Sequence, residues 1–279
     1  MQARIRNRHG LNMPKLGLGT WPLIGAECSA AVRQALELGY RHIDTAAGYH
    51  NEDAVGQALA DSPVPREDIH VTSKVWWDRL APADLAQSLD DSLRALRSDY
   101  LDLFMIHWPG QNGSLLGDDL KRSVEALVAA RDSGKARAIG VANFPLALLR
   151  ETVETLGAPL AAIQVEYHLM LNQQPLLDYA RAHDMVLTAY TPLGRGRMLE
   201  EPAIQAIARR HGVLPSQVAL AWLLEQDGVA AIPKAASLAN QRSNLAALDL
   251  RLDDEDRAQI AALPKNVRLV SPEFAPKWD

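Results

Sequence analysis

Cysteine is nearly absent from the sequence. Cys28 is the one cysteine among 279 residues, which excludes an internal disulfide within this chain. A lone cysteine fits a reducing compartment, so we expect a cytoplasmic protein in which Cys28 is a small residue on a helix rather than a reactive thiol. The first ten residues, MQARIRNRHG, also lack the apolar stretch of a secretory signal, which agrees with the same location.

Long apolar runs, strong charge and linkers are missing as well. No run of about 18 apolar residues occurs, so we expect no membrane-spanning segment. The formal net charge of −5 argues against nucleic acid as a partner. No low-complexity linker divides the chain, and apolar residues make up 48% of it. We therefore expect one domain with a sizeable core over residues 1–279.

What the sequence contains is a regular alternation of short β-like segments and longer helix-like stretches, such as residues 82–96 and 119–133. Eight β/α units in a chain of this length predict a (β/α)8 TIM barrel. A doubly wound sheet is the alternative, but GLGTWPLIG after the first segment is not the G-x-G-x-x-G loop that such a sheet usually carries. The eight β-like segments are residues 15–20, 41–46, 69–75, 100–108, 136–143, 161–168, 185–192 and 228–235.

Both ends of the chain lie outside this alternation. Residues 4–14 carry a His-Gly turn between two short strand-like pieces, which predicts an N-terminal β-hairpin covering one end of the barrel. Residues 263–279 contain three prolines and predict an extended C-terminal tail.

Polar side chains end most of the β-like segments. The C-terminal ends of barrel strands carry the active site in enzymes of this fold. Residues two apart share a face of a strand, so Asp44 shares one with His42, and Lys74 shares one with His70. We therefore predict that Asp44, Lys74 and His107 meet at one mouth of the barrel, with Tyr49 on the loop beyond Asp44. The segment ends are Thr20, Asp44, Lys74, His107, Asn143, Gln164 to His168, Tyr190 and Lys234.

These residue types can transfer a proton to a carbonyl oxygen. Tyrosine is a weak acid with a pKa of about 10, and a nearby ammonium such as Lys74 lowers that value. A carboxylate such as Asp44 would hold the lysine charged, and an imidazole such as His107 would orient the carbonyl. No side chain supplies hydride, so this chemistry requires a nicotinamide cofactor.

Six segments resemble, in order, the signatures of the aldo-keto reductase family: GYRHIDTAAGYHNEDAVG, VTSKVW, DYLDLFMIHWP, IGVANF, IQVEYH and AYTPLGRG. The resemblance covers almost the whole chain. It implies a barrel that binds NADP(H) without a Rossmann domain and reduces small aldehydes and ketones. It also implies a catalytic tetrad of Asp44, Tyr49, Lys74 and His107, with Tyr49 as the general acid. The tail RLVSPEFAPKWD resembles that of bacterial 2,5-diketo-gluconate reductases, which also reduce methylglyoxal.

The resemblance further implies a set of cofactor contacts. Asn143 and Gln164 match residues that bind the nicotinamide carboxamide, and Tyr190 matches the aromatic residue that stacks on its ring. Ala235 and Asn240 stand where the family commonly has a serine and an arginine that binds the 2′-phosphate. We therefore expect a weakened preference for NADPH, with NADH usable as well. The full expected set is Thr20, Trp21, Asp44, Asn143, Gln164, Tyr190, Thr191, Pro192, Leu193, Gly194, Lys234, Asn240 and Asn244.

Aromatic residues near the strand ends predict an apolar substrate pocket. From the tail, Phe274 or Trp278 could cap it. The expected partner is a small carbonyl compound, and we expect a monomer that uses no metal. The expected substrate-binding residues are Trp21, Tyr49, Trp76, His107 and Trp108.

Two other functions stay open at this point. A metal-dependent hydrolase would use His42, Asp44, His50 and His107 as ligands, but it leaves Tyr49 and Lys74 unexplained. A non-catalytic, regulatory barrel that still binds the nicotinamide nucleotide is the second, and an inert protein that bound the nucleotide would favour it.

Overall fold

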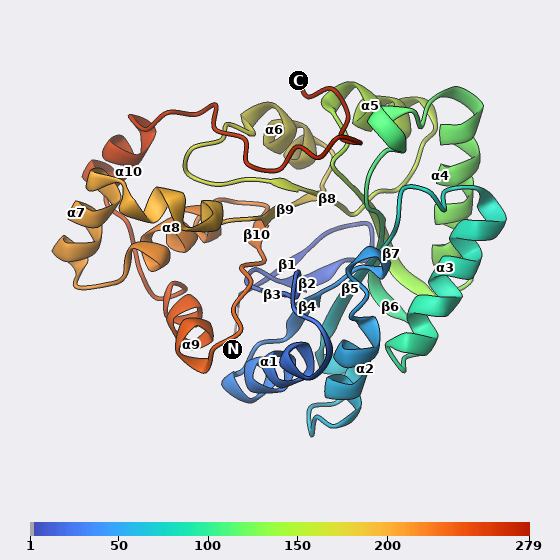
Figure 1. Ribbon diagram of the computed structural model, residues 1–279. Coiled ribbons are helices and arrows are strands. Elements are labelled where there is room, and N and C mark those ends of the chain that lie inside the picture. The colour runs from blue at the N-terminus through green and yellow to red at the C-terminus, as the bar shows by residue number, and fades with distance from the viewer. Residues whose placement is uncertain (1–2) are drawn as a thin grey trace.

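Eight parallel strands form a ring in the structure, a computed structural model that describes residues 3–279 (Figure 1). Each strand pairs with the next along the chain, from β3 to β10. The ring closes where the Gly17 N–H donates to the Ala231 carbonyl at 2.9 Å and the Ala231 N–H donates to the Lys15 carbonyl at 2.8 Å. The predicted (β/α)8 barrel is confirmed, and the doubly wound alternative is wrong. The strands are β3 (Leu18–Gly19), β4 (His42–Asp44), β5 (His70–Val75), β6 (Leu101–Ile106), β7 (Ala136–Ala142), β8 (Ala162–Glu166), β9 (Val186–Tyr190) and β10 (Val229–Ala231).

Helices cover the outside of the ring, and most of them pack an apolar face on the core between helices and strands. Ile204, Ile207 and Ile260 belong to a second buried cluster. Gly39 follows α1 in the left-handed conformation, with φ of 100°, which glycine adopts without steric cost. Pro82 opens α3, where its missing N–H removes no helical hydrogen bond. The helices are α1 (Gly25–Leu38), α2 (Glu52–Ala60), α3 (Pro82–Ala95), α4 (Gly117–Asp132), α5 (Leu146–Arg150), α6 (Gln174–Ala182), α7 (Pro202–His211), α8 (Pro215–Leu224), α9 (Leu238–Ala246) and α10 (Asp254–Ala261).

Cys28 lies on α1 and is fully buried. Burial raises the pKa of its thiol to about 12, so the reactive thiolate is not formed near neutral pH. The expectation of a structural residue on a helix is therefore confirmed. No helix within residues 3–279 has the length and apolar character needed to cross a membrane.

A β-hairpin closes the N-terminal end of the barrel. β1 (Arg4–Arg6) pairs antiparallel with β2 (Asn12–Pro14), which confirms the predicted hairpin. Leu11 and Met13 are buried against side chains that fill the barrel interior, among them Leu103 and Met105 of β6. The hairpin is therefore the floor of the barrel, opposite the C-terminal ends of the strands.

The C-terminal tail passes along the α6 side of the ring, as the red segment of Figure 1 shows. It runs from beyond α10 to a point beside α5, where the Asp279 carboxylate accepts the backbone N–H of Leu146 at 2.7 Å. Residues 266–279 form no helix or strand. The predicted extended tail is confirmed, and it lies over the mouth where the polar strand ends gather.

Candidate active site

Asp44 and Lys74 form a buried ion pair at the C-terminal ends of β4 and β5. The Lys74 ammonium donates to Asp44 Oδ1 at 2.6 Å and to the carbonyl of Thr45 at 2.8 Å. Neither side chain is more than 1% exposed. Burial lowers the pKa of Lys74, while the charge of Asp44 opposes that change. Each charge needs the other at this depth, so the pair is held in one geometry.

Tyr49 lies beside this pair. It ends the 3-10 turn Ala47–Tyr49 after β4, and Lys74 Nζ lies 3.5 Å from its hydroxyl oxygen. The sequence predicts that Lys74 lowers the pKa of Tyr49. For the protein without cofactor this prediction is wrong. Burial raises the pKa of Tyr49 well above its ordinary value, and the Asp44 charge adds to the rise. The Lys74 ammonium lies closer to Asp44 than to Tyr49, and the Asp44 carboxylate offsets its charge. Desolvation therefore decides the direction of the shift in the Tyr49 pKa. The phenol therefore keeps its proton at neutral pH.

His107 completes the group at the end of β6. Its ring meets the Tyr49 ring edge to face, with centroids 5.3 Å apart, and the Trp76 ring at 4.9 Å. Burial lowers the pKa of His107 well below its ordinary value, and the Lys74 charge lowers it further. The imidazole is therefore neutral near pH 7 and has one N–H to donate. The four predicted residues do converge at one mouth of the barrel.

The loop that carries Tyr49 is fixed by Asn51, a residue that is not among those predicted from the sequence. Asn51 is fully buried. Its side chain accepts a hydrogen bond from the Thr45 hydroxyl at 2.6 Å and donates to the carbonyl of Leu23 at 2.8 Å. These bonds tie the loop after β4 to the loop after β3. A polar residue two positions after Tyr49 was the available signal, but the sequence gives no indication of its partners.

The amides expected to bind nicotinamide are bonded directly to the tetrad. Gln164 Nε2 donates to Asp44 Oδ2 at 2.8 Å. Asn143 Nδ2 donates to the backbone carbonyl of His107 at 2.9 Å, and the Tyr190 hydroxyl donates to Asn143 Oδ1 at 2.7 Å. These contacts orient both amides, so cofactor-binding and proton-transfer residues form one connected network.

A cavity of about 820 Å³ opens onto this network. Two cations, Arg195 and Lys234, share its lining with several aromatic rings. The tail adds Leu269, Val270, Ser271, Pro272 and Phe274, of which only Phe274 is predicted from the sequence as a pocket residue. The predicted residues that line the cavity are Thr20, Trp21, Asp44, Tyr49, Trp76, His107, Trp108, Asn143, Tyr190, Thr191, Pro192, Leu193 and Lys234.

Other expected cofactor residues lie outside this lining. Gln164 lies behind Asp44, and Gly194 sits between the lining residues Leu193 and Arg195. Asn240 lies in the first turn of α9, where its backbone N–H donates to the Ser237 hydroxyl at 3.2 Å. Asn244 is buried on the same helix, at 3% exposure. The structure therefore does not bring Asn240 and Asn244 into the cavity.

The cavity residues fit a nicotinamide dinucleotide. The volume of the cavity is within the range of small-molecule sites, which run from about 300 to 1,000 Å³. The oriented amides suit the carboxamide group of nicotinamide, and the phenol ring of Tyr190 suits its flat ring. Arg195 and Lys234 suit anionic phosphates, for which arginine and lysine are the usual ligands.

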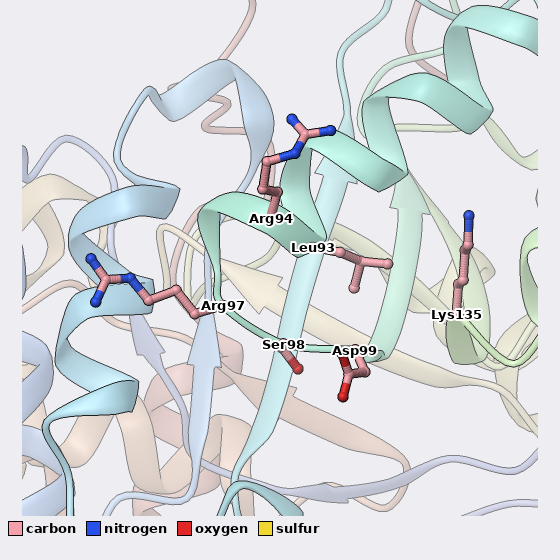
Figure 2. A pocket seen from close by; sticks show the side chains of 6 residues that line it. All are labelled: Leu93, Arg94, Arg97, Ser98, Asp99 and Lys135. Carbon is pink, nitrogen blue, oxygen red and sulfur yellow. The ribbon is translucent and has the colours of Figure 1, made fainter.

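Two other features of the described residues do not form a comparable site. A second hollow of about 430 Å³ lies where α3 leads into β6, and Figure 2 shows the charged ends of Arg94, Arg97 and Lys135 well separated there rather than converging on one point. One group with metal-ligand spacing, His211, Asp253 and Asp256, joins α7 to α10, and the guanidinium of Arg210 bonds to both aspartates. The ligands proposed for a metal hydrolase are not grouped in this way, so no observation favours that function.

A barrel with a tyrosine, a lysine, an aspartate and a histidine at its C-terminal mouth is typical of one class of carbonyl reductase. Comparison with known proteins agrees with this class. A model of the aldo/keto reductase family matches residues 15–265. The chain therefore belongs to the aldo-keto reductase family, whose members are NADP(H)-dependent reductases.

Similar proteins span nearly the full length of the chain. Methylglyoxal reductase DkgB of Salmonella typhimurium is 42% identical over 271 residues, which are 96% of this chain and 100% of the relative. An aldo-keto reductase of Mycolicibacterium smegmatis is 40% identical, with 96% of both chains covered.

Solved structures agree with both fold and family. A protein designated a 2,5-diketo-D-gluconic acid reductase B matches with a TM-score of 0.94 and 39% identity, over 100% of this chain and 98% of the other. A variant of Gox0644 in complex with NADPH matches with a TM-score of 0.90 and 31% identity, over 98% and 97% of the two chains.

Proposed function

We propose that this reductase converts small aldehydes and ketones to alcohols, with Tyr49 as the proton donor. The observation that carries the proposal is the Tyr49 hydroxyl, which lies 3.5 Å from the buried Lys74 ammonium in a cavity shared with His107. NADPH supplies the hydride when it is bound. The protein's own part is to orient the carbonyl and to deliver one proton to its oxygen.

Each tetrad residue has a separate role in this proposal. The neutral His107 imidazole donates a hydrogen bond that orients the carbonyl oxygen. Tyr49 holds its proton until the oxygen becomes alkoxide-like, because only a strong base removes a proton from a phenol of raised pKa. Lys74 then stabilises the phenolate that remains, and Asp44 keeps Lys74 charged and in position.

We propose methylglyoxal and diketo-sugar acids as substrates. The relatives named above are a methylglyoxal reductase and a 2,5-diketo-D-gluconic acid reductase, and both align over nearly the whole chain. Trp76, Trp108 and Phe274 give the cavity an apolar wall suited to a small carbonyl compound. Arg195, which also lines the cavity, is available to a carboxylate.

For the cofactor, we propose that NADPH is preferred and that NADH is also used. The expected contacts are Asn143, Gln164 and Tyr190 on the nicotinamide, the segment 191–194 on the pyrophosphate, and Lys234 with α9 at the adenosine end. Asn240 carries no charge, so the 2′-phosphate lacks one charge-assisted partner.

We also propose that the chain acts as a single-domain monomer in the cytoplasm. The cavity is built from one chain, and the buried thiol of Cys28 suits a reducing location. Light scattering over a range of concentrations tests the monomer, and cell fractionation tests the location.

The test of the activity follows NADPH oxidation by the purified protein with methylglyoxal and with a diketo-sugar acid. Removing a positioned general acid typically costs about 10²–10⁴-fold in rate, so we expect Tyr49→Phe to lose that much kcat while its Kd for NADPH stays the same. Absence of turnover by the native protein over a panel of aldehydes and ketones, with NADPH still bound, would favour the non-catalytic nicotinamide-binding barrel instead.

A further inference from the structure

Glu166 is a buried carboxylate that the proposed mechanism does not use. It ends β8, two residues after Gln164, so both side chains lie on the inward face of that strand. The side chain is 0% exposed. A carboxylate at this depth requires donors, and all of its nearest donors belong to the loop that follows β8 or to the C-terminal tail.

Two of those donors are backbone N–H groups of the tail. Leu269 N–H donates to Glu166 Oε1 at 2.7 Å, and Val270 N–H donates to Oε2 at 2.9 Å. The guanidinium of Arg268 lies 3.9 Å from Oε2 and stacks on the ring of Trp278, 3.8 Å from its centroid. One side chain therefore bonds to two successive tail residues and faces the charge of a third.

The third hydrogen bond comes from His168, and its direction is fixed. His168 Nδ1 accepts the backbone N–H of Met170 at 3.3 Å, so the ring proton is on Nε2. Nε2 then donates to Glu166 Oε1 at 3.0 Å. The carboxylate accepts at every contact and donates at none. A neutral amide of the same shape would present an N–H to one of these donors and would lose at least one bond.

The residues held in this way form part of the substrate wall. Leu269, Val270 and Phe274 line the cavity. The Phe274 ring centroid lies 5.6 Å from that of Trp76 and 5.3 Å from that of Trp108, the aromatic residues expected to face the substrate. Because the tail has no helix or strand of its own, its position depends on such anchoring contacts.

We propose that Glu166 is a positioning residue for substrate recognition: its carboxylate fixes the tail so that residues 269–274 form a close wall over the cavity. The part of the inference that concerns substrate binding rests on the proposed reductase activity, whereas the anchoring of the tail can be measured without any activity. Loss of the carboxylate loosens the wall, weakens the binding of small substrates and admits larger ones.

The first test measures backbone amide exchange in the native protein. We expect the Leu269 and Val270 amides to exchange at least about tenfold more slowly than the exposed amides of residues 273 and 277, because each donates to a buried charge. Equal exchange rates would overturn the proposal without any variant and without any measurement of activity.

The second test compares Glu166→Gln with a matched control, Asp256→Asn. Asp256 is also fully buried and accepts from the backbone N–H of Asp253 at 3.0 Å and from His211 at 2.7 Å. It lies on α10 and does not line the cavity. The control therefore reports what the loss of a buried carboxylate does by itself.

For Glu166→Gln we expect the KM for methylglyoxal to rise about tenfold, with kcat within about threefold and the Kd for NADPH within about twofold of the native values. The ratio of kcat/KM for 4-nitrobenzaldehyde to that for methylglyoxal should rise at least about fivefold. Asp256→Asn should leave both KM and this ratio unchanged.

An unchanged KM and ratio in a folded Glu166→Gln would overturn the proposal. So would a weakening of NADPH binding as large as the change in KM, because Glu166 would then act on the cofactor site. A native protein that reduces neither aldehyde contradicts the proposed function, while the amide exchange still decides the anchoring of the tail.

Discussion

For the buried pair of Lys74 and Asp44, we expect that removing one residue costs more stability than removing both. Lys74→Met leaves the Asp44 carboxylate buried with Gln164 as its remaining side-chain donor, at 2.8 Å. Breaking a buried pair on one side typically costs about 3–5 kcal/mol, whereas replacing both partners is often near neutral. We therefore expect Lys74→Met to lower the free energy of unfolding by about that amount.

The double variant Asp44→Asn/Lys74→Met provides the control for this prediction. Urea unfolding of both proteins gives the two free energies. The double variant should be at least about 1 kcal/mol more stable than Lys74→Met. Additive losses would contradict the view that the two charges depend on each other.

A prediction at the scale of one element concerns the turn that carries Tyr49. Gly48 packs against Trp76 so closely that a Cβ on Gly48 would lie 2.4 Å from Trp76 Cε3. Gly48→Ala therefore pushes the turn and the aromatic wall apart, at a cost of about 1–3 kcal/mol in stability. We expect a raised KM for methylglyoxal and a lower kcat, because Tyr49 moves as well, and steady-state kinetics would measure both.

A smaller ring should relieve this clash. The effect of Gly48→Ala on kcat is measured in the native protein and in Trp76→Phe. We expect Gly48→Ala to lower kcat less in the Trp76→Phe background than in the native protein. An alanine at position 48 that leaves kcat and KM unchanged would show that the close packing does not position Tyr49.

The first turn of α9 is the element where cofactor choice is expected to be set. Asn240→Arg adds a guanidinium there, and a charge-assisted bond to phosphate is worth about 1.5–3 kcal/mol. We expect the Kd for NADPH to fall at least about tenfold while that for NADH changes little. Asn240→Gln has a longer side chain without the charge, so it should leave both values near native; fluorescence titration measures them. Equal tightening of NADPH and NADH by Asn240→Arg would count against a 2′-phosphate contact.

The sequence predicts those elements whose signals are local. Strand positions follow from short apolar segments, and the C-terminal ends of parallel strands meet at one mouth, so Asp44, Lys74 and His107 could be placed together before the structure was known. Gly39 at the end of α1 and Pro82 at the start of α3 are local signals of the same kind. Glu166 and Asn51 could not be assigned, because each also bonds to backbone groups that are distant in the sequence. The Tyr49 pKa was predicted in the wrong direction because desolvation depends on burial, which spacing does not report.

For the whole molecule, buried neutral histidines predict how stability depends on pH. Burial lowers the pKa of His42 to about 4 and that of His70 and His107 well below the ordinary value. The unfolded chain binds a proton at each histidine below about pH 6.5, while the folded protein does not. Stability is therefore complete above pH 6.5 and declines as the pH falls from 6.5 towards 4.

His42, with a folded-state pKa of about 4, should cost about 2 kcal/mol of stability between pH 7 and pH 5, and His70 and His107 should add to this loss. Urea unfolding at several pH values measures this decline. The unfolding free energy of His70→Asn should fall less between pH 7 and pH 5 than that of the native protein, because one buried histidine is missing. This holds whatever the stability of the variant at pH 7. A native protein whose unfolding free energy is the same at pH 7 and pH 5 would contradict the prediction.

The contact between Glu166 and the tail involves main-chain N–H groups, and this affects how the enzyme can be re-engineered. Leu269 and Val270 line the cavity, while the bonds that hold these residues to Glu166 come from their backbone. Any amino acid except proline keeps such an N–H. A library that varies positions 269 and 270 can therefore reshape the pocket while the anchoring remains, and proline should be depleted among its active members.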